Sequence, residues 1–224
     1  MGMGTRRGFT LIELLAVIGI MLVLMVAAFG VFNLFAKQSG PQAAAATVQA
    51  MLNAARDYAA SNGVDAQVVF TAYPTRPGDG TSMQLEYRPI NGTAFVPVPA
   101  RRPILLRDEI YVLKEMPSSL PTPPAAALNP RNPTETELRN WAIYEKALLD
   151  AVSAFAFASG GTLKTDHQKF YVVFDPAGYM KGDPAEPAKT VQVGMTVVQA
   201  SGNRVVQYVF YPLNANTGTR LVFE

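Results

Sequence analysis

The residues whose types and spacing could do chemistry lie at the start of the chain. Arg6, Arg7 and Gly8 precede residues 9–36, a run of 28 residues that contains a single charge, Glu13. About 20 apolar residues span a bilayer as a helix, so this run is long enough to cross a membrane. A carboxylate inside such a segment costs about 2.5–3.5 kcal/mol at the helix centre and less near the interface, which makes Glu13 a candidate functional residue.

Two other membrane signals fit this run less well. A secretory signal peptide would have an apolar core of 7–15 residues followed by a small-x-small cleavage site, whereas this run is about twice as long and leads into Ala36-Lys37-Gln38. An ordinary single-span anchor fits the length but accounts for neither Glu13 nor the Arg-Gly-Phe entry. The basic pair at the start holds the short leader on the cytoplasmic side, which places the rest of the chain outside.

The N-terminal segment resembles the type III signal of type IV pilins and type II secretion pseudopilins. It consists of basic residues, Gly8, Phe9, the tripeptide Thr-Leu-Ile, Glu13 and a continuous apolar helix. The resemblance implies that a prepilin peptidase cleaves between Gly8 and Phe9 and methylates the new N-terminus at Phe9. It also implies that Glu13, the fifth residue of the mature chain, acts in filament assembly by pairing with the amino group of Phe9 on a neighbouring subunit.

The same resemblance implies partners and a location. We expect the prepilin peptidase/methyltransferase, other pilin or pseudopilin subunits in a helical filament, and the inner-membrane assembly platform as partners. The chain is expected to be a single-pass protein of the bacterial inner membrane with its C-terminal domain in the periplasm or at the cell exterior. It is expected to move into a filament on assembly.

The fold that the resemblance implies is α+β and pilin-like. A long N-terminal helical spine, apolar in its first half, is expected to pack on an antiparallel β-sheet domain that carries an inserted helix. The expected divisions are a leader at 1–8, a transmembrane or filament-core half of the spine at 9–36, an amphipathic half at 37–62, and a globular β-rich domain at 63–224 with an insertion at about 115–160.

Local patterns position the outer half of this spine. Gly40-Pro41 predicts a kink or a short break, because proline lacks an amide donor and clashes with the preceding turn. Asn62-Gly63 predicts the end of the helix. The apolar residues that recur at helical spacing, and are therefore expected to face the sheet, are Val48, Met51, Leu52, Ala55, Tyr58 and Ala59.

The rest of the chain reads mainly as strands. Strands are predicted first at 66–72, 82–88 (these two as a hairpin) and 110–114, then in a second cluster at 170–174, 190–198, 204–211 and 220–223, with a hairpin turn at 200–203. Nine of the 17 prolines lie between 97 and 133, which predicts an extended surface excursion at 115–133.

A helix is predicted from Glu135 to Ala158. We expect Asn132 to cap its start and Gly160-Gly161 to end it. Its apolar face, which must dock on its own sheet or on another subunit, comprises Leu138, Trp141, Leu148, Leu149, Val152 and Phe155.

No catalytic residue, metal site or cofactor is expected. His167, the only histidine, lies between Asp166 and Gln168 and is predicted to be a solvated loop residue. Cysteine is absent, and no HExxH, GxSxG or phosphate-binding glycine loop is present. The final 14 residues contain only one acidic residue, Glu224, so a calcium site near the C-terminus is not expected.

Nucleic acid is not expected as a partner. The chain has 19 basic and 17 acidic residues, and removal of the leader with Arg6 and Arg7 would leave 17 of each. A balanced charge gives no electrostatic argument for binding an acidic polymer. The small cluster of Arg101, Arg102 and Arg107 is therefore interpreted as a solvated rim, and the strand aromatics at 170–174 and 208–211 as core.

Two stretches favour one branch of the family. Residues 54–59, which run into 68–70, and the Phe174–Gly178 stretch are similar to features of the H-type minor pseudopilins and related minor pilins. The favoured function is a minor pseudopilin, a structural subunit of a short periplasmic type II secretion pseudopilus. The alternative is a minor type IV pilin for pilus assembly, adhesion or DNA uptake. An enzyme is not expected.

Overall fold

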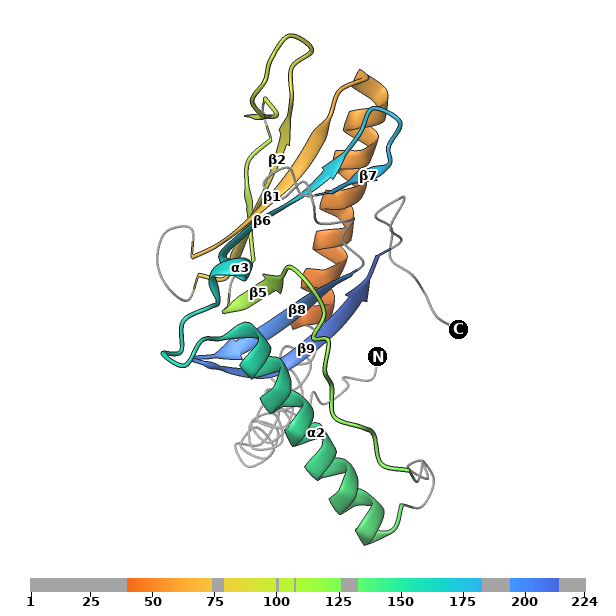
Figure 1. Ribbon diagram of the computed structural model, residues 1–224, viewed down its shortest axis with the longest axis vertical. Coiled ribbons are helices and arrows are strands. Elements are labelled where there is room, and N and C mark those ends of the chain that lie inside the picture. Colours follow the sequence, from red (N-terminus) through yellow and green to blue (C-terminus); the bar gives the residue numbers. More distant parts are fainter. Residues whose placement is uncertain are drawn as a thin grey trace, which may run out of the picture. The chain divides into compact units, whose positions relative to one another are not determined.

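The computed structural model describes residues 40–73, 79–99, 101–106, 108–125, 133–182 and 194–213. The chain divides into two units, Met1–Gly40 and Pro41–Glu224. Apart from Gly40, the described residues belong to the second unit, in which a helix is followed by antiparallel sheets (Figure 1). Within the described ranges, no helix combines the length and apolarity that crossing a membrane requires. The predicted leader at 1–8 and the apolar run at 9–36 lie outside these ranges.

Residues 40–62 form one continuous helix. Its predicted apolar face is confirmed, because Val48, Met51, Leu52, Ala55 and Ala59 are buried and Tyr58 packs against them. No break occurs between 40 and 62. The predicted kink at Gly40-Pro41 concerns the junction with residues outside the description and is not tested by it.

The helix ends where the sequence predicts. Gly63 has φ +64°, and the Val64 amide donates to the Ala59 carbonyl oxygen at 3.2 Å. A left-handed residue after the last turn allows this closing hydrogen bond, and glycine adopts that conformation without a steric penalty from Cβ.

The first sheet has the strand order β3-β2-β1-β6-β7, and β4 also pairs with β2. Its strands are β1 (Ala66–Ala72), β2 (Thr81–Tyr87), β3 (Val96–Pro97), β4 (Ile104–Leu105), β6 (Lys169–Phe174) and β7 (Met180–Lys181). The predicted hairpin is confirmed, because β1 and β2 pair antiparallel over their full lengths, from Ala66 opposite Tyr87 to Ala72 opposite Thr81.

One strand belongs to a different sheet from the one the sequence order suggested. We grouped 170–174 with the C-terminal strands, but β6 pairs antiparallel with β1 in the first sheet. The physical reason is long-range packing, which the order of elements along the chain does not reveal. β6 reads KFYVVF, with four of its six residues buried, and it lies between β1 and β7.

The second sheet has the order β5-β8-β9 and is also antiparallel. Its strands are β5 (Ile110–Leu113), β8 (Gly194–Ser201) and β9 (Arg204–Pro212). The predicted hairpin at 200–203 is confirmed. Gln199 pairs with Gln207 and Ala200 with Val205, so Val206 is an extra residue on β9, as in a β-bulge. The strand predicted at 220–223 lies outside the described residues.

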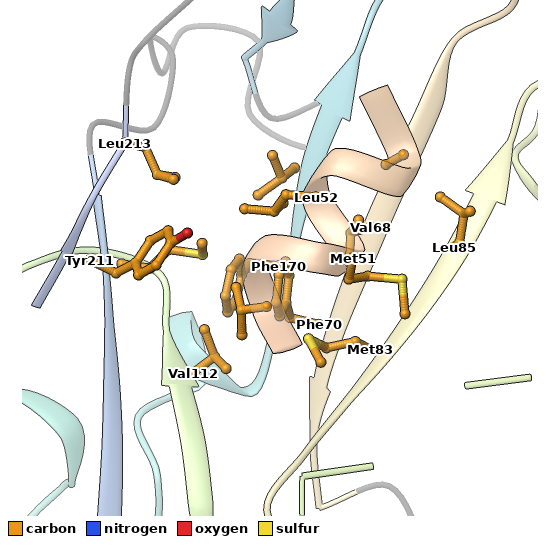
Figure 2. Close-up of a cluster of buried hydrophobic side chains, with 14 of the residues drawn as sticks. Met51, Leu52, Val68, Phe70, Met83, Leu85, Val112, Phe170, Tyr211 and Leu213 are labelled. Atoms are coloured by element: carbon orange, nitrogen blue, oxygen red, sulfur yellow. The ribbon is translucent and has the colours of Figure 1, made fainter. Parts of the chain in front are cut away.

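The main core lies between the helix at 40–62 and the two sheets. Figure 2 shows Met51 and Leu52 of the helix meeting Phe70 and Phe170 of the first sheet, with Tyr211 of the second sheet on the other side. The Phe70 and Phe170 rings stack with centroids 4.6 Å apart and planes 5° apart. The Tyr211 hydroxyl donates to Oε1 of Gln49 on the helix. The helix at 40–62 is therefore an integral part of the second unit's core.

Two further helices complete the described chain, α2 (Glu135–Ala156) and α3 (Thr165–Gln168). The end of α2 packs on the second sheet in a smaller core that contains Val152 and Ala156 together with Tyr111 and Val198. The Val205 amide of β9 donates to the Ser153 hydroxyl oxygen at 2.9 Å, which fixes the end of α2 against that strand.

Candidate interaction surface

The predicted processing and assembly residues, Gly8, Phe9 and Glu13, lie outside the described residues. Within the described ranges, no three His, Cys, Asp or Glu side chains come together in a way that could hold a metal ion. The candidate functional surface is therefore built from the second unit, beginning with the positions that the sequence singled out.

His167 is not the solvated loop residue that its polar neighbours suggested. It is 5% exposed and belongs to α3. The Lys114 amide donates to its Nδ1 at 3.4 Å, so its Nε2 carries the proton and donates to the Phe155 carbonyl oxygen at 3.3 Å. The sequence prediction was wrong because polar neighbours along the chain do not determine the burial of a side chain. Asp166 is exposed, while the His167 ring packs on Phe155 with centroids 4.8 Å apart.

The position of His167 determines its protonation. Burial lowers the pKa of the imidazole, because the charged form loses solvation. The hydrogen bond to the Phe155 carbonyl and the Asp166 carboxylate act in the opposite direction, and Lys164 acts with burial. A neutral His167 joins the end of β5, the end of α2 and α3 at one point.

The Phe174–Gly178 stretch forms a tight turn that packs on the helix at 40–62. The Asp175 carboxylate accepts hydrogen bonds from the Ala177 and Tyr179 amides at 2.9 and 2.8 Å. Gly178 has φ +79°, and a Cβ placed there would lie 3.3 Å from Cγ of Arg56. The turn and the Arg-containing part of the helix, which the sequence comparison treated as separate features, are thus in contact.

Asp65 ties together the strand ends near this turn. Its carboxylate, which is largely buried, pairs with Arg88 at the end of β2 and with Nζ of Lys181 in β7, the latter at 2.8 Å. Arg88 in turn lies over the Phe95 ring, 5.2 Å from its centroid. These contacts are structural, since each charge already faces an opposite charge or a ring.

The start of α2 uses a different cap from the expected one. Thr134 is the N-cap. The Glu137 amide donates to its hydroxyl oxygen at 3.3 Å, and the Thr134 amide donates to the Glu137 carboxylate at 2.7 Å. This reciprocal arrangement is a capping box, and the Thr-x-x-Glu spacing that signals it is readable in the sequence. The Thr134 amide and the Thr134 hydroxyl both donate to the Glu137 carboxylate, and these hydrogen bonds lower the pKa of Glu137.

The predicted cap residue Asn132 lies outside the described residues, and Thr134 occupies the cap position. The end of the helix is also earlier than expected. α2 stops at Ala156, where Phe157 takes an extended conformation and forms a β-bridge with Leu163. Gly160 and Gly161 belong to the turn that this bridge encloses.

The two halves of α2 differ in burial. The structure describes the whole helix, and its buried residues are Leu148, Val152 and Ala156, all in the second half. In the first half Leu138 is 50% exposed and Ile143 63% exposed. The predicted apolar face therefore packs on the chain's own sheet only in the second half, and the alternative of a contact with another subunit stays open for the first half. We call the first half the arm and define it as residues 135–147.

The extended segment that precedes α2 lies along one side of the arm. Residues 115–125 contain no helix or strand, which confirms the predicted excursion as far as it is described. Trp141 and Tyr144 meet edge to face, with ring centroids 5.6 Å apart. Between the segment and the arm is a groove of about 570 Å³, lined by Pro121, Thr122, Pro124, Ala125, Glu137, Asn140, Trp141, Ile143, Tyr144 and Ala147.

A second exposed apolar site follows β2. Ile90 is 84% exposed, more than any other large hydrophobic side chain in the described residues. It lies in a tight turn in which the Gly92 amide donates to the Pro89 carbonyl oxygen at 2.8 Å. Farther along the same connection Arg101 and Arg102 are exposed, as predicted for a solvated rim. The sequence analysis did not single out Ile90. Its Pro-Ile-Asn-Gly context is typical of a tight turn and therefore indicates an exposed isoleucine.

The strand aromatics are mostly core, as predicted. Phe170, Phe174 and Tyr211 are buried, and Tyr208 and Phe210 are half-buried in the smaller core beside α2. Burial raises the pKa of the Tyr208 hydroxyl. These rings therefore pack in the two cores.

Comparison with known families gives one match. The family model of the prokaryotic N-terminal methylation motif matches residues 3–29, a span that contains Gly8, Phe9 and Glu13. This motif is the hallmark of type IV pilins and pseudopilins. Comparisons with curated proteins and with solved structures find no match.

The motif carries consequences at the level of the family. It implies processing by a prepilin peptidase and assembly with other pilin subunits, and proteins of this type are anchored in a membrane before they assemble. They are structural subunits rather than enzymes. The order of elements in the second unit, a helix followed by antiparallel β-sheet, is that of a pilin-like fold. The chain therefore carries the N-terminal motif that is the hallmark of type IV pilins and pseudopilins, followed by a domain with a pilin-like fold.

Proposed function

We propose that this protein is a minor pseudopilin, a structural subunit of a short periplasmic type II secretion pseudopilus. The observation that carries the proposal is the methylation motif at 3–29 within an apolar run whose only charge is Glu13. The turn at Phe174–Gly178, which packs on Arg56 of the helix at 40–62, supports the H-type branch.

The proposed maturation begins with the leader, residues 1–8. The prepilin peptidase cleaves between Gly8 and Phe9 and methylates the amino group of Phe9. Residues 9–36 then hold the chain in the inner membrane as a single span, with 37–62 and the domain at 63–224 in the periplasm. The basic pair Arg6-Arg7 supports this orientation.

Glu13 is proposed to act in assembly. A lone carboxylate in a medium of low dielectric is costly, and pairing with an opposite charge recovers part of that cost. The charge available in the family arrangement is the amino group of Phe9 on the neighbouring subunit. Pairing therefore favours transfer of the span from the membrane into a filament, where the inner-membrane assembly platform adds subunits.

The first experiment tests maturation. We expect mass spectrometry of the full-length protein, expressed with a prepilin peptidase, to find a chain that begins at N-methylated Phe9. An intact Met1, or cleavage after Ala36, would contradict the proposed processing. Gly8→Leu is expected to leave the leader attached, whereas Gly4→Leu, a glycine in the same leader, is expected to leave cleavage unchanged.

The second experiment tests the role of Glu13. We expect Glu13→Val to give a cleaved, membrane-bound protein that is recovered with the other filament subunits at roughly a tenth or less of the normal level, since a lost ion pair in a desolvated site affects assembly more than stability. Glu13→Asp keeps the charge and is the matched control. Normal recovery of Glu13→Val with its partner subunits would refute the pairing.

The alternative proposal is a minor type IV pilin for pilus assembly, adhesion or DNA uptake. Its N-terminal chemistry is the same, so the two proposals differ in what a deletion abolishes. Loss of protein secretion with pili retained supports the pseudopilin. Loss of pili, adhesion or transformation with secretion retained supports the pilin.

A further inference from the structure

Two exposed apolar features of the second unit lie far apart. One is the groove between the arm and the Pro-rich segment, whose floor includes the edge-to-face pair Trp141 and Tyr144. The other is the turn at 89–92, which holds Ile90 at its tip. Figure 1 shows the connection after β2 and the helix α2 at opposite ends of this unit.

The two features are complementary in shape. The groove is concave, and its volume of about 570 Å³ exceeds that of one aliphatic side chain and leaves room for the turn that carries it. Ile90 is convex and almost fully exposed. Burial of an isoleucine side chain is favourable by about 1.5–3 kcal/mol, and aromatic side chains that form a pocket for an apolar anchor are typical of the centre of an interface.

The charged residue that lines the groove and the exposed charges of the β2 connection are of opposite sign. Glu137 lines the groove, its carboxylate is ionised because the cap hydrogen bonds lower its pKa, and Glu135 is exposed in the same helical turn. The connection from 89 to 106 contains no acidic residue and exposes Arg101 and Arg102. Opposite charges at the rim of an interface direct the approach of the partners and select the partner that carries them.

We propose that the Ile90 turn of one copy of this protein docks in the α2 groove of a second copy. The surface on one copy differs from the surface on the other, so the contact is heterologous. Because the two surfaces lie at opposite ends of the same unit, a pair of copies keeps one free turn and one free groove, and the contact propagates as an open row. This interface uses the second unit alone and does not depend on the function proposed above.

Cysteine cross-linking of the full-length protein in detergent tests the contact, since the natural chain has no cysteine. One preparation carries Asn91→Cys, which labels the turn and keeps Ile90, and a second carries Ala147→Cys, a small exposed residue that lines the groove. A mixture of the two, treated with a short bismaleimide, is expected to give a covalent dimer. Neither preparation alone is expected to give one, because a heterologous contact does not bring two copies of the same position together.

A matched pair of variants tests the apolar anchor. Ile90→Lys in the Ala147→Cys chain removes the anchor from that copy only and leaves its groove intact, so the Asn91→Cys copy, which keeps Ile90, is expected to cross-link to it as before. The anchor that enters the groove is removed by adding Ile90→Lys to the Asn91→Cys chain. Adding Ile90→Lys to Asn91→Cys is expected to lower the dimer yield at least about tenfold, whereas adding Val206→Lys, at another exposed apolar position, is expected to leave it unchanged.

Each other outcome overturns the proposal. If both cysteines react with maleimide but the mixture gives no dimer, the two surfaces do not meet. A dimer from Asn91→Cys alone shows a symmetric contact instead. A cross-link formed in cell membranes only to a protein of different mass shows that the groove accepts another subunit and not a second copy.

Discussion

The helix at 40–62 and α2 are of nearly equal length and both carry apolar residues at helical spacing, yet they are held in different ways. The first helix buries residues along its whole described length, from Ala44 to Ala59. In α2 the buried residues start only at Leu148. The comparison shows that helical periodicity predicts that a helix forms, while burial depends on whether a sheet face lies within reach. The first helix has two sheets against it, and α2 extends beyond the edge strand β9 (Figure 1).

The largest expected effect on stability comes from shortening one leucine in the main core, compared with one leucine on the arm. Leu52 is 1% exposed in the main core and Leu138 is 50% exposed on the arm. We expect Leu52→Ala to lower the free energy of unfolding by about 2–5 kcal/mol, because it leaves a cavity. We expect Leu138→Ala to change that free energy by less than about 0.5 kcal/mol. Urea unfolding of the full-length protein in detergent measures both, and equal losses would show that the arm belongs to the same cooperative core.

An intermediate effect is expected from pH, at the junction where α2 meets the sheets. Burial lowers the pKa of His167 below its ordinary value of 6.5, so the unfolded chain takes up a proton at a higher pH than the folded one. The stability contributed by neutral His167 is therefore complete above about pH 6.5. It is lost as the pH falls from that value to the folded-state pKa, and stays constant below it.

The measurement for this junction is urea unfolding of the full-length protein between pH 7.5 and pH 5, made in parallel on His167→Gln. Glutamine cannot titrate, so the difference between the two proteins isolates the histidine from carboxylates such as Glu115 and Asp166. We expect the natural protein to lose stability relative to the variant as the pH falls. A difference that is independent of pH, or one that grows in the opposite direction, would contradict the buried neutral state.

The sequence predicted the elements better than their contacts. β1 matches its expected bounds at both ends, and the helix stop at Gly63 follows from local chemistry, since each depends on a few neighbouring residues. The placement of β6 beside β1 was missed because strand order is set by long-range packing. His167 was misjudged for the same reason, as its partners Lys114 and Phe155 are distant in the sequence. The sequence could indicate candidate processing residues because their signal is a linear motif, which the family model also matches at residues 3–29, and their roles stay predictions.

The smallest effect on global stability is expected at the N-cap of α2. It tests most directly whether the two halves of α2 are held in different ways. A lost N-cap costs a helix about 0.5–2 kcal/mol, but a cost to the arm reaches global unfolding only if the arm is coupled to the core. The buried part of α2 starts at Leu148, more than three turns after the cap. We therefore expect Thr134→Ala to speed amide hydrogen exchange in the arm about 2- to 30-fold, as that range of free energy dictates. The urea midpoint of the full-length protein should hardly change. Thr134→Ser, which keeps the hydroxyl acceptor, is the matched control and should exchange like the natural protein. Faster exchange at Val152 and Ala156 as well as in the arm, with a lower urea midpoint, would show that α2 unfolds as one piece with the core and that its two halves are not distinct.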